Sequence, residues 1–318
     1  MSMPLPKTHR RQSGYTAIDL IVVLFLVAGF FLLLLLSIPR AREQARLAAC
    51  QKNLAQIGQA IAQYDTRCGS LPSVGPLAPL DREENSKSAG PLPAGPLRTI
   101  IETLGQGDFQ DLAGGATSPP SRGPVPGEIP LRGFICSSDA NATARVLKAP
   151  INYRACTGGD QLGQDGAFAP SRTVSVAAVE QSDGTSFTAA FSERLTGSGE
   201  DGHPAIWAYA STPGPLPSGI CSLGWLEGRH ARFHGDAGSS WFLADYPSTL
   251  YNHGLAPDTL LSCVAMDGQS AHMGASSGHT RGVNLLLLDG SVKLIVPTVD
   301  TKIWKEFASI GNESARAN

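Results

Sequence analysis

Uncharged, mostly apolar residues run without interruption from Leu20 to Ile38, directly after a polar and basic stretch. A helix formed by this run is long enough to cross the roughly 30 Å hydrocarbon core of a bilayer. The run exceeds the apolar region of about 7–15 residues in a secretory signal peptide, and no Ala-x-Ala-like cleavage site follows it. The pattern therefore predicts a transmembrane helix over residues 15–38 that crosses the lipid bilayer once and stays with the protein.

One carboxylate, Asp19, lies near the start of this helix. An Asp within a membrane helix costs about 2.5–3.5 kcal/mol at the bilayer centre and less near the end of the span. We therefore expect Asp19 to pair with a cation, to be protonated or to lie at the interface. Cleavage after Gly14 would create an amine on Tyr15, one helical turn from Asp19, which could pair with it in the same chain or a neighbouring one.

A second apolar pattern continues the helix beyond Pro39. Apolar residues recur every three or four positions, at Leu47, Cys50, Leu54, Ile57, Ile61 and Tyr64. This spacing places them along one side of an otherwise polar helix, so it predicts an amphipathic helix over 39–66 that packs on a globular domain. Pro39 would kink the resulting rod, about 75 Å long from Tyr15 to Tyr64, rather than end it. A coiled-coil dimer along this seam is the alternative.

Beyond residue 66 the apolar runs become short and alternate with tracts rich in proline and glycine. Loops are expected over 69–96 and 114–130. Strands are expected over Leu131–Cys136, Thr173–Val179, Phe187–Glu193 and Ala205–Ala210, and short helices over Leu97–Leu104 and Thr301–Ser309. Asp289-Gly290 between the runs Val283–Leu288 and Ser291–Val296 is typical of a β-hairpin. The prediction is an α+β fold, with a long N-terminal helix packed on a β-rich, loop-rich domain over 67–318.

Composition narrows the function classes. Charged residues make up only 16% of the chain, whereas glycine (35) and proline (23) are abundant, which suits an extracytoplasmic domain better than a helical cytosolic enzyme. The net charge of -2 gives no electrostatic basis for binding nucleic acid.

Six cysteines lie far apart and form no Cys-x-x-Cys pair: Cys50, Cys68, Cys136, Cys156, Cys221 and Cys263. This spacing does not predict a zinc site. It favours one to three disulfides formed in an oxidising compartment, and reduced, buried thiols are the alternative. The sequence does not choose among the pairings.

The N-terminus Arg10-Arg11-Gln12-Ser13-Gly14-Tyr15-Thr16-Ala17-Ile18-Asp19 resembles that of type IV prepilins and pseudopilins. The resemblance implies a basic leader over 1–14, a prepilin peptidase that cleaves after Gly14 and methylates Tyr15, and an assembly role for Asp19, where the family usually has Glu. It also implies an inner-membrane protein whose C-terminal domain lies outside the cytoplasm. An uncleaved signal anchor is the alternative.

A wider resemblance covers nearly the whole chain, to a pilin-like, type II secretion pseudopilin-like family of planctomycete-type bacteria. Its members join a prepilin N-terminus to a domain of unknown function that ends in His, nine residues and Asp-Gly, here His279 and Asp289-Gly290. The other matching pieces are Cys50-Gln51-Lys52-Asn53-Leu54, Cys136-Ser137-Ser138-Asp139, Asn152-Tyr153, and Asp183-Gly184-Thr185-Ser186 with Glu193. Ser137 stands where the family usually has proline.

Candidate site residues have structural explanations as well as chemical ones. Asp289 before Gly290 is explained by a turn that accepts backbone N–H groups, and His279 by a hydrogen bond at the entry to the hairpin, with metal or ligand binding as the alternative for both. Asp183-Gly184-Thr185-Ser186 is explained by a turn before a strand, with calcium as the alternative.

Two further patterns carry weaker chemistry. His230 and His234 would lie on one helix face suited to a metal, but Gly228 and Gly235 beside them favour a loop. Gly274–Gly278 matches Gly-x-Ser-x-Gly, but the strand–turn–helix context of a nucleophile elbow is missing, so chance explains it.

The resemblance implies a structural subunit that assembles through its N-terminal helix in a secretion or pilus-like system. Its expected partners are the lipid bilayer, the prepilin peptidase, and other pilin-like subunits or copies of itself. The alternative is a membrane-tethered binding module for a glycan, an ion or a protein that does not polymerise. We expect no enzymatic activity and no cofactor apart from the calcium alternative.

Overall fold

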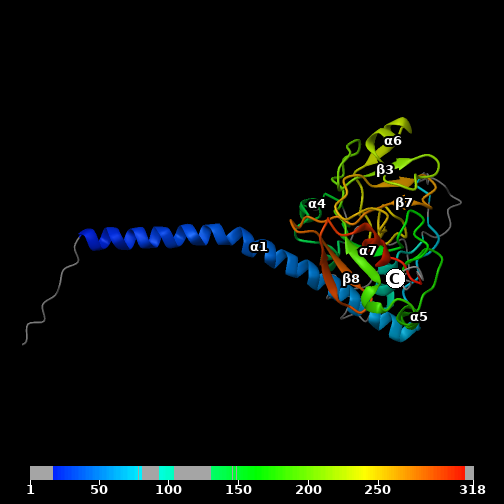
Figure 1. The fold of residues 1–318 in the computed structure, drawn as a ribbon, viewed down its shortest axis with the longest axis horizontal. Helices are drawn as coiled ribbons and strands as arrows, with labels where there is room; N and C mark the ends of the chain where they lie inside the picture. Colours follow the sequence, from blue (N-terminus) through cyan, green and yellow to red (C-terminus); the bar gives the residue numbers. More distant parts are fainter. Residues whose placement is uncertain are drawn as a thin grey trace, which may run out of the picture. The chain divides into compact units, whose positions relative to one another are not determined.

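A computed structural model describes residues 17–77, 79–80, 93–103, 130–144, 146–147 and 149–311 (Figure 1). The chain divides into two compact units, Met1–Ala45 and Arg46–Asn318. The expected cleavage residues Gly14 and Tyr15 lie outside the described residues, as does almost all of the tract 114–130.

Helix α1 (Ala17–Cys68) contains 52 residues and continues through Pro39, so the predicted rod is one helix. In the first unit its apolar side chains between Ile18 and Leu32 are exposed, and Asp19 lies in its first turn. Among the described residues, no helix is both long enough and apolar enough to cross a membrane.

Within the second unit α1 buries the predicted seam. Cys50, Leu54, Ile57 and Ile61 are no more than 3% exposed. Figure 1 shows this part of α1 running beside β8 (Val283–Leu287). Gly58 permits the close approach, because a Cβ atom there would lie 3.0 Å from the Cδ1 atom of Leu286.

Among the described residues, a five-stranded sheet with the order β5-β1-β2-β8-β9 forms the centre of the second unit. Besides β8, its strands are β1 (Tyr153–Cys156), β2 (Ala189–Glu193), β5 (Leu250–Tyr251) and β9 (Val292–Ile295). β1 and β5 run parallel, and the other pairs are antiparallel. Every residue of β2 and β8 is buried, so both faces of these central strands are covered.

The predicted hairpin is confirmed as β8 and β9, with Leu286 opposite Val292. The Asp289 Oδ1 atom accepts hydrogen bonds from the backbone N–H of Ser291 at 2.8 Å and from its hydroxyl at 2.6 Å. Gly290 has a φ of 84°, which residues with a Cβ rarely adopt. Asp289 therefore supplies the acceptor, and Gly290 the backbone conformation, that this tight turn requires.

A four-stranded sheet of the described residues has the order β4-β3-β6-β7. Its strands are β3 (Tyr209–Thr212), β4 (Arg232–His234), β6 (Cys263–Ala265) and β7 (Ala271–His272). Helix α6 (Leu223–Gly228) lies beside this sheet, at the opposite end of the unit from α5 (Val176–Gln181) (Figure 1). The remaining elements are short: α2 (Pro96–Thr103), η1 (Arg132–Phe134), α4 (Ala140–Ala144), η2 (Thr185–Phe187) and α7 (Thr301–Glu306).

Two of the predicted strands are wrong. Thr173–Val179 contains the start of helix α5, because the Ser175 hydroxyl accepts from the Ala178 N–H and caps that helix, which outweighs the β-branched residues around it. Leu131–Cys136 contains the 3₁₀ turn η1 instead of a strand. The strand expected over Ala205–Ala210 begins later, as β3.

The helices and the overall class agree with the sequence. Helices α2 and α7 confirm the short helices expected near residues 97 and 301. Asp300 caps α7 by accepting from the backbone N–H groups of Lys302 and Ile303. The mixed α+β class is therefore confirmed, with two β-sheets in the domain that follows a long N-terminal helix.

Candidate functional site

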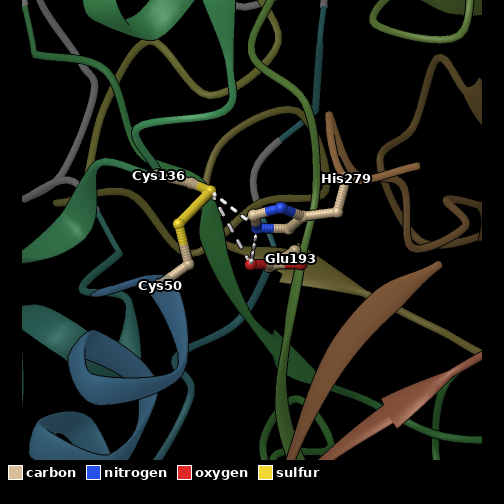
Figure 2. Close-up of side chains that lie close together, drawn as sticks. All are labelled: Cys50, Cys136, Glu193 and His279. Atoms are coloured by element: carbon tan, nitrogen blue, oxygen red, sulfur yellow. Dashed lines mark hydrogen bonds and ion pairs between the residues drawn. A yellow bond between two sulfur atoms is a disulfide. The ribbon is translucent and has the colours of Figure 1, made fainter. Parts of the chain in front are cut away.

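Four buried side chains from distant parts of the sequence converge beside the five-stranded sheet (Figure 2). Cys50, Cys136, Glu193 and His279 each offer one atom of a type that ligates metals, and these atoms all lie within 4.8 Å of one another. None of the four residues is more than 5% exposed. Cys50 and Cys136 are joined in a disulfide, so the cluster combines a disulfide, a carboxylate and an imidazole.

A different element positions each of these residues. Cys50 lies on the buried seam of α1, and Cys136 follows the turn η1. Glu193 is the last residue of β2, and His279 precedes β8. The disulfide joins residues 86 positions apart in the sequence, and it fixes this part of α1 to the β-rich domain.

The Glu193 carboxylate is held by donors on both of its oxygens. Oε2 accepts from the backbone N–H of Asn284 and from the Ser277 hydroxyl, each at 2.9 Å. Oε1 accepts from the Asn284 side-chain amide at 2.9 Å. A buried carboxylate needs such donors, because a buried charge without hydrogen-bond partners destabilises the fold by several kcal/mol, as an order of magnitude.

His279 points into the cluster (Figure 2). Its Nε2 atom lies 3.4 Å from the Cys136 sulfur and 3.5 Å from Oε1 of Glu193. The hydroxyl of Ser277 accepts from the His279 backbone N–H at 3.2 Å, and the backbone N–H of Ser277 donates to Asp258 at 2.9 Å. The segment before β8 is thus tied to the same carboxylate that its imidazole faces.

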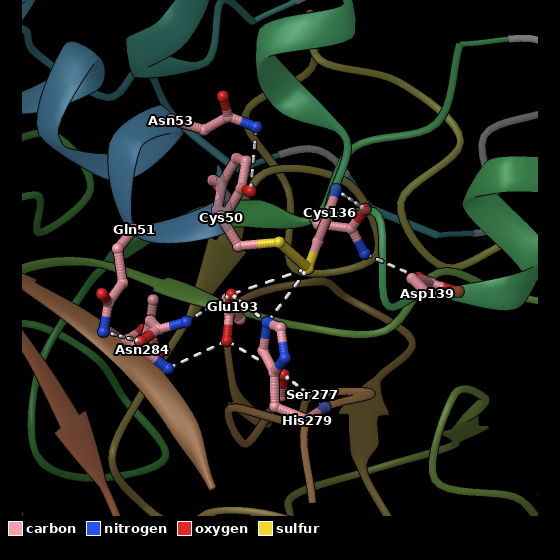
Figure 3. Close-up of polar contacts among 12 residues, drawn as sticks. Cys50, Gln51, Asn53, Cys136, Asp139, Glu193, Ser277, His279 and Asn284 are labelled. Atoms are coloured by element: carbon pink, nitrogen blue, oxygen red, sulfur yellow. Dashed lines mark hydrogen bonds and ion pairs between the residues drawn. A yellow bond between two sulfur atoms is a disulfide. The ribbon is translucent and has the colours of Figure 1, made fainter. Parts of the chain in front are cut away.

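A second set of hydrogen bonds holds the Cys136 end of the cluster (Figure 3). The Asn152 side chain accepts from the Cys136 backbone N–H at 2.8 Å and donates to Oδ2 of Asp139 at 2.6 Å. That oxygen also accepts from the backbone N–H and the hydroxyl of Thr196. The loop that carries Cys136 is therefore fixed to the end of β2, next to Glu193.

Two polar side chains of α1 complete the contacts (Figure 3). Gln51 donates to Oδ1 of Asn284 at 3.1 Å, and Asn53 donates to the Tyr153 hydroxyl at 3.2 Å. Burial raises the pKa of Tyr153 well above its ordinary value, and the charge of Glu193 raises it further. The Tyr153 hydroxyl is therefore neutral and acts only as a hydrogen-bonding group.

The remaining residues suggested by the sequence lie apart from this cluster. Asp289 and Gly290 form the hairpin turn. Asp183 accepts from the Gly311 backbone N–H at 2.6 Å, and Gly184 precedes η2 with a φ of 86°. These four residues have local roles at the ends of helices and strands. Of the family-motif residues named from the sequence, only Glu193 lies in the cluster with His279.

His230 and His234 do not share a helix face. His230 follows α6 with a φ of 53°, and His234 ends strand β4, where its Nε2 atom lies 2.7 Å from the Ser211 hydroxyl. The Gly-x-Ser-x-Gly residue Ser276 is buried, and its hydroxyl accepts from the Leu195 backbone N–H at 3.1 Å. The structure thus gives the His234 ring and the Ser276 hydroxyl partners within the fold, while His230 is exposed.

The prediction of one to three disulfides is confirmed. Besides Cys50–Cys136, the described residues contain a Cys221–Cys263 disulfide, which ties the segment before α6 to β6. Cys68 is an exposed free cysteine, and Cys156 is a buried one. Burial raises the pKa of the Cys156 thiol to about 12, so this cysteine is an inert part of the core at neutral pH.

The sequence did not indicate the residues that hold the cluster in place. Asn284 and Ser277 donate to Glu193, and Asp258 accepts from Ser277. Their polar side chains resemble ordinary loop and strand residues, and no local pattern marks them. Asn284 carried the one available signal, because a polar residue stands inside the apolar run 283–288 and a fully buried strand rarely tolerates such a residue without a partner.

The fold and the site define a mixed α+β domain that carries a long N-terminal helix and a buried cluster of cysteine, carboxylate and imidazole groups. The chain belongs to the family described as a protein of unknown function (DUF1559), whose model matches residues 39–302. No curated protein and no solved structure matches the chain. The family agrees with the domain of unknown function expected from the sequence, while the prepilin-type N-terminus stays a prediction.

Proposed function

We propose that this protein is a pilin-like structural subunit that is held in the inner membrane by the first part of α1 and associates with other subunits through it. The observation that carries the proposal is the exposure of apolar side chains on α1 between Ile18 and Leu32. A helix with apolar residues all around it is stable only when lipid or other helices cover it. Continuation of the same helix to Cys68, where the β-rich domain packs on it, supports a subunit that carries this domain on the anchored rod.

Asp19 gives the proposal a specific assembly contact. The residue lies in the first turn of α1, where a carboxylate also interacts favourably with the helix dipole. Cleavage after Gly14 would place the positive charge of the Tyr15 amine at the same end of the helix. Neutralisation of Asp19 by this amine, in the same chain or in a neighbouring one, would then favour side-by-side packing of the helices.

Mass spectrometry of the membrane-extracted protein tests the class directly. We expect a chain that begins at an N-methylated Tyr15, and an intact leader that still starts at Met1 would rule out the pilin-type function. A processed or unprocessed chain that remains monomeric in crosslinking experiments in its native membrane would favour the tethered binding module instead.

Substitution of Asp19 tests the assembly contact. Asp19→Ala is expected to abolish crosslinking between subunits while leaving the fold intact, and Asp19→Glu is expected to retain it. Glu43→Gln provides the matched control, because it neutralises another carboxylate of α1 outside the first turn. Equal crosslinking of Asp19→Ala and the wild type would remove the assembly role of this residue.

A further inference from the structure

We propose that Cys50, Cys136, Glu193 and His279 form a zinc site when the Cys50–Cys136 disulfide is reduced, so that a metal ion and a disulfide are alternative cross-links at one place in the fold. The four ligating atoms already lie within 4.8 Å of one another in the disulfide form. This site is independent of the proposed assembly function.

Three of the four atoms have the spacing of tetrahedral coordination. The Cys136 sulfur lies 3.4 Å from Nε2 of His279 and 3.7 Å from Oε1 of Glu193, and the latter two atoms are 3.5 Å apart. Zinc bonds of about 2.0–2.3 Å in a tetrahedron separate neighbouring ligand atoms by roughly 3.3–3.7 Å. These three atoms therefore outline one face of a zinc site without any movement.

The fourth ligand requires a small displacement. In the disulfide the Cys50 sulfur is bonded to the Cys136 sulfur, whereas two thiolates on one zinc ion are separated by about 3.7 Å. The sulfurs must therefore move apart by about 1.7 Å. The Cα atoms of the two cysteines are 5.3 Å apart, a separation from which side-chain rotation can open this distance.

The surroundings of the cluster orient its ligands. Asn284 and Ser277 hold the Glu193 carboxylate so that Oε1 faces the His279 ring and the Cys136 sulfur (Figure 3). Hydrogen bonds of this kind position the ligands of natural metal sites and raise their affinity. Two sulfurs and one imidazole nitrogen favour a borderline ion such as Zn²⁺ over Ca²⁺ or Mg²⁺, which prefer oxygen ligands.

Charge and atoms balance in both steps. A small dithiol reduces the disulfide by thiol–disulfide exchange, which gives two protein thiols and one disulfide of the reductant, with two electrons and two protons transferred. Zn²⁺ then replaces the two thiol protons, which are released to solvent. Because one Zn²⁺ replaces two protons, the net charge of the cluster is the same before and after zinc binds, so metallation adds no net charge to the buried site.

Cobalt provides the spectroscopic test. The full-length protein in detergent is reduced with a phosphine under native conditions and titrated with Co²⁺. We expect one equivalent to bind, with the visible bands and the near-ultraviolet sulfur-to-cobalt band of tetrahedral thiolate coordination, and Zn²⁺ to displace it. The oxidised protein should show none of these bands, because both sulfurs are then used in the disulfide.

Variants locate the site. His279→Ala and Glu193→Gln are expected to weaken cobalt binding at least about tenfold, and Asn284→Ala about 10–100-fold through the loss of ligand orientation. Cys68→Ser and the double variant Cys221→Ser/Cys263→Ser should retain the wild-type spectrum. These variants test the free thiol of Cys68 and the two thiols that reduction also releases. Circular dichroism confirms that each variant is folded.

Alkylation of the wild-type protein tests the same point without any substitution. In the reduced protein, zinc should slow the reaction of Cys50 and Cys136 with iodoacetamide relative to the metal-free form, and a chelator should abolish this protection. Zinc should leave the reaction of Cys221 and Cys263, which are equally buried, unchanged. A folded, reduced protein without stoichiometric cobalt bands would overturn the proposal. So would bands that persist in His279→Ala and Glu193→Gln, or bands lost with Cys221 and Cys263.

Discussion

Glu193 and Asn284 lie on the neighbouring strands β2 and β8 and are joined by two hydrogen bonds of 2.9 Å, one from the backbone N–H and one from the side-chain amide of Asn284. The Asn284 oxygen also accepts from Gln51 of α1 at 3.1 Å. One buried amide thus connects the helix, the sheet and the carboxylate that faces His279. Loss of this amide should therefore change the free energy of unfolding by a measurable amount.

Asn284→Ala should lower the free energy of unfolding by about 1–3 kcal/mol, because Oε1 of Glu193 loses a donor while it remains buried. Urea titration of the oxidised protein measures this change. Gln59→Ala removes an amide from an exposed position of α1 and should change stability by no more than about 0.5 kcal/mol. Similar losses in the two variants would show that Glu193 does not depend on Asn284.

The two disulfides are expected to differ in their contribution to stability. Cys50–Cys136 joins residues separated by 86 positions, and Cys221–Cys263 joins residues separated by 42. Removal of a native disulfide typically costs about 2–5 kcal/mol, and loop entropy alone makes the longer closure more stabilising by roughly 0.6 kcal/mol. Cys50→Ala/Cys136→Ala should therefore unfold at lower urea than Cys221→Ala/Cys263→Ala. The reverse order would contradict the central position of the first disulfide.

The approach of α1 to β8 depends on the absence of a side chain at Gly58. A Cβ atom there would lie 3.0 Å from the Leu286 side chain and 3.4 Å from the Gly290 backbone. Gly58→Leu should destabilise the protein by about 1–3 kcal/mol through overpacking. Gln59→Leu adds a similar side chain to the exposed side of the same helix and is the control, and thermal unfolding compares the two. A stable Gly58→Leu protein would mean that helix and hairpin separate easily.

Local signals in the sequence were sufficient for several elements. The seam from Cys50 to Ile61, the hairpin turn at Asp289-Gly290 and the short helix expected from Thr301 each depend on residues a few positions apart. Periodicity and turn chemistry act at that range, and the structure contains all three features. The strand predicted over Thr173–Val179 failed for the same kind of reason, because one serine that caps a helix outweighed its β-branched neighbours.

The sequence did not predict which distant segments pair with one another. Strands β5 and β7 contain two residues each and are too short to show any periodicity. The meeting of Cys50, Cys136 and His279 depends on segments separated by 86 and 143 positions, which only the folded chain brings together. The sequence marked these residues individually, through their chemistry and the family resemblance, but it did not indicate that they form one cluster.

A buried histidine outside the cluster is expected to make the stability of the protein depend on pH. The His253 ring stacks on the indole of Trp304 with ring centres 3.4 Å apart, and its Nε2 atom lies 3.0 Å from the Tyr251 hydroxyl. Burial lowers the pKa of His253 from 6.5 to about 3, so the imidazole is neutral in the folded protein. In the unfolded chain it binds a proton near its ordinary pKa.

Between about pH 6.5 and pH 3 the unfolded chain therefore binds more protons at this position than the folded chain does. The free energy of unfolding should fall as the pH decreases through this range, by up to about 1.4 kcal/mol per pH unit. His253→Gln removes this titration. Because other buried groups titrate as well, the quantity to measure is the difference in urea stability between wild type and variant at pH 7, 6 and 5. This difference should shrink as the pH falls, while a constant difference would show that His253 takes up its proton equally in the folded and the unfolded chain.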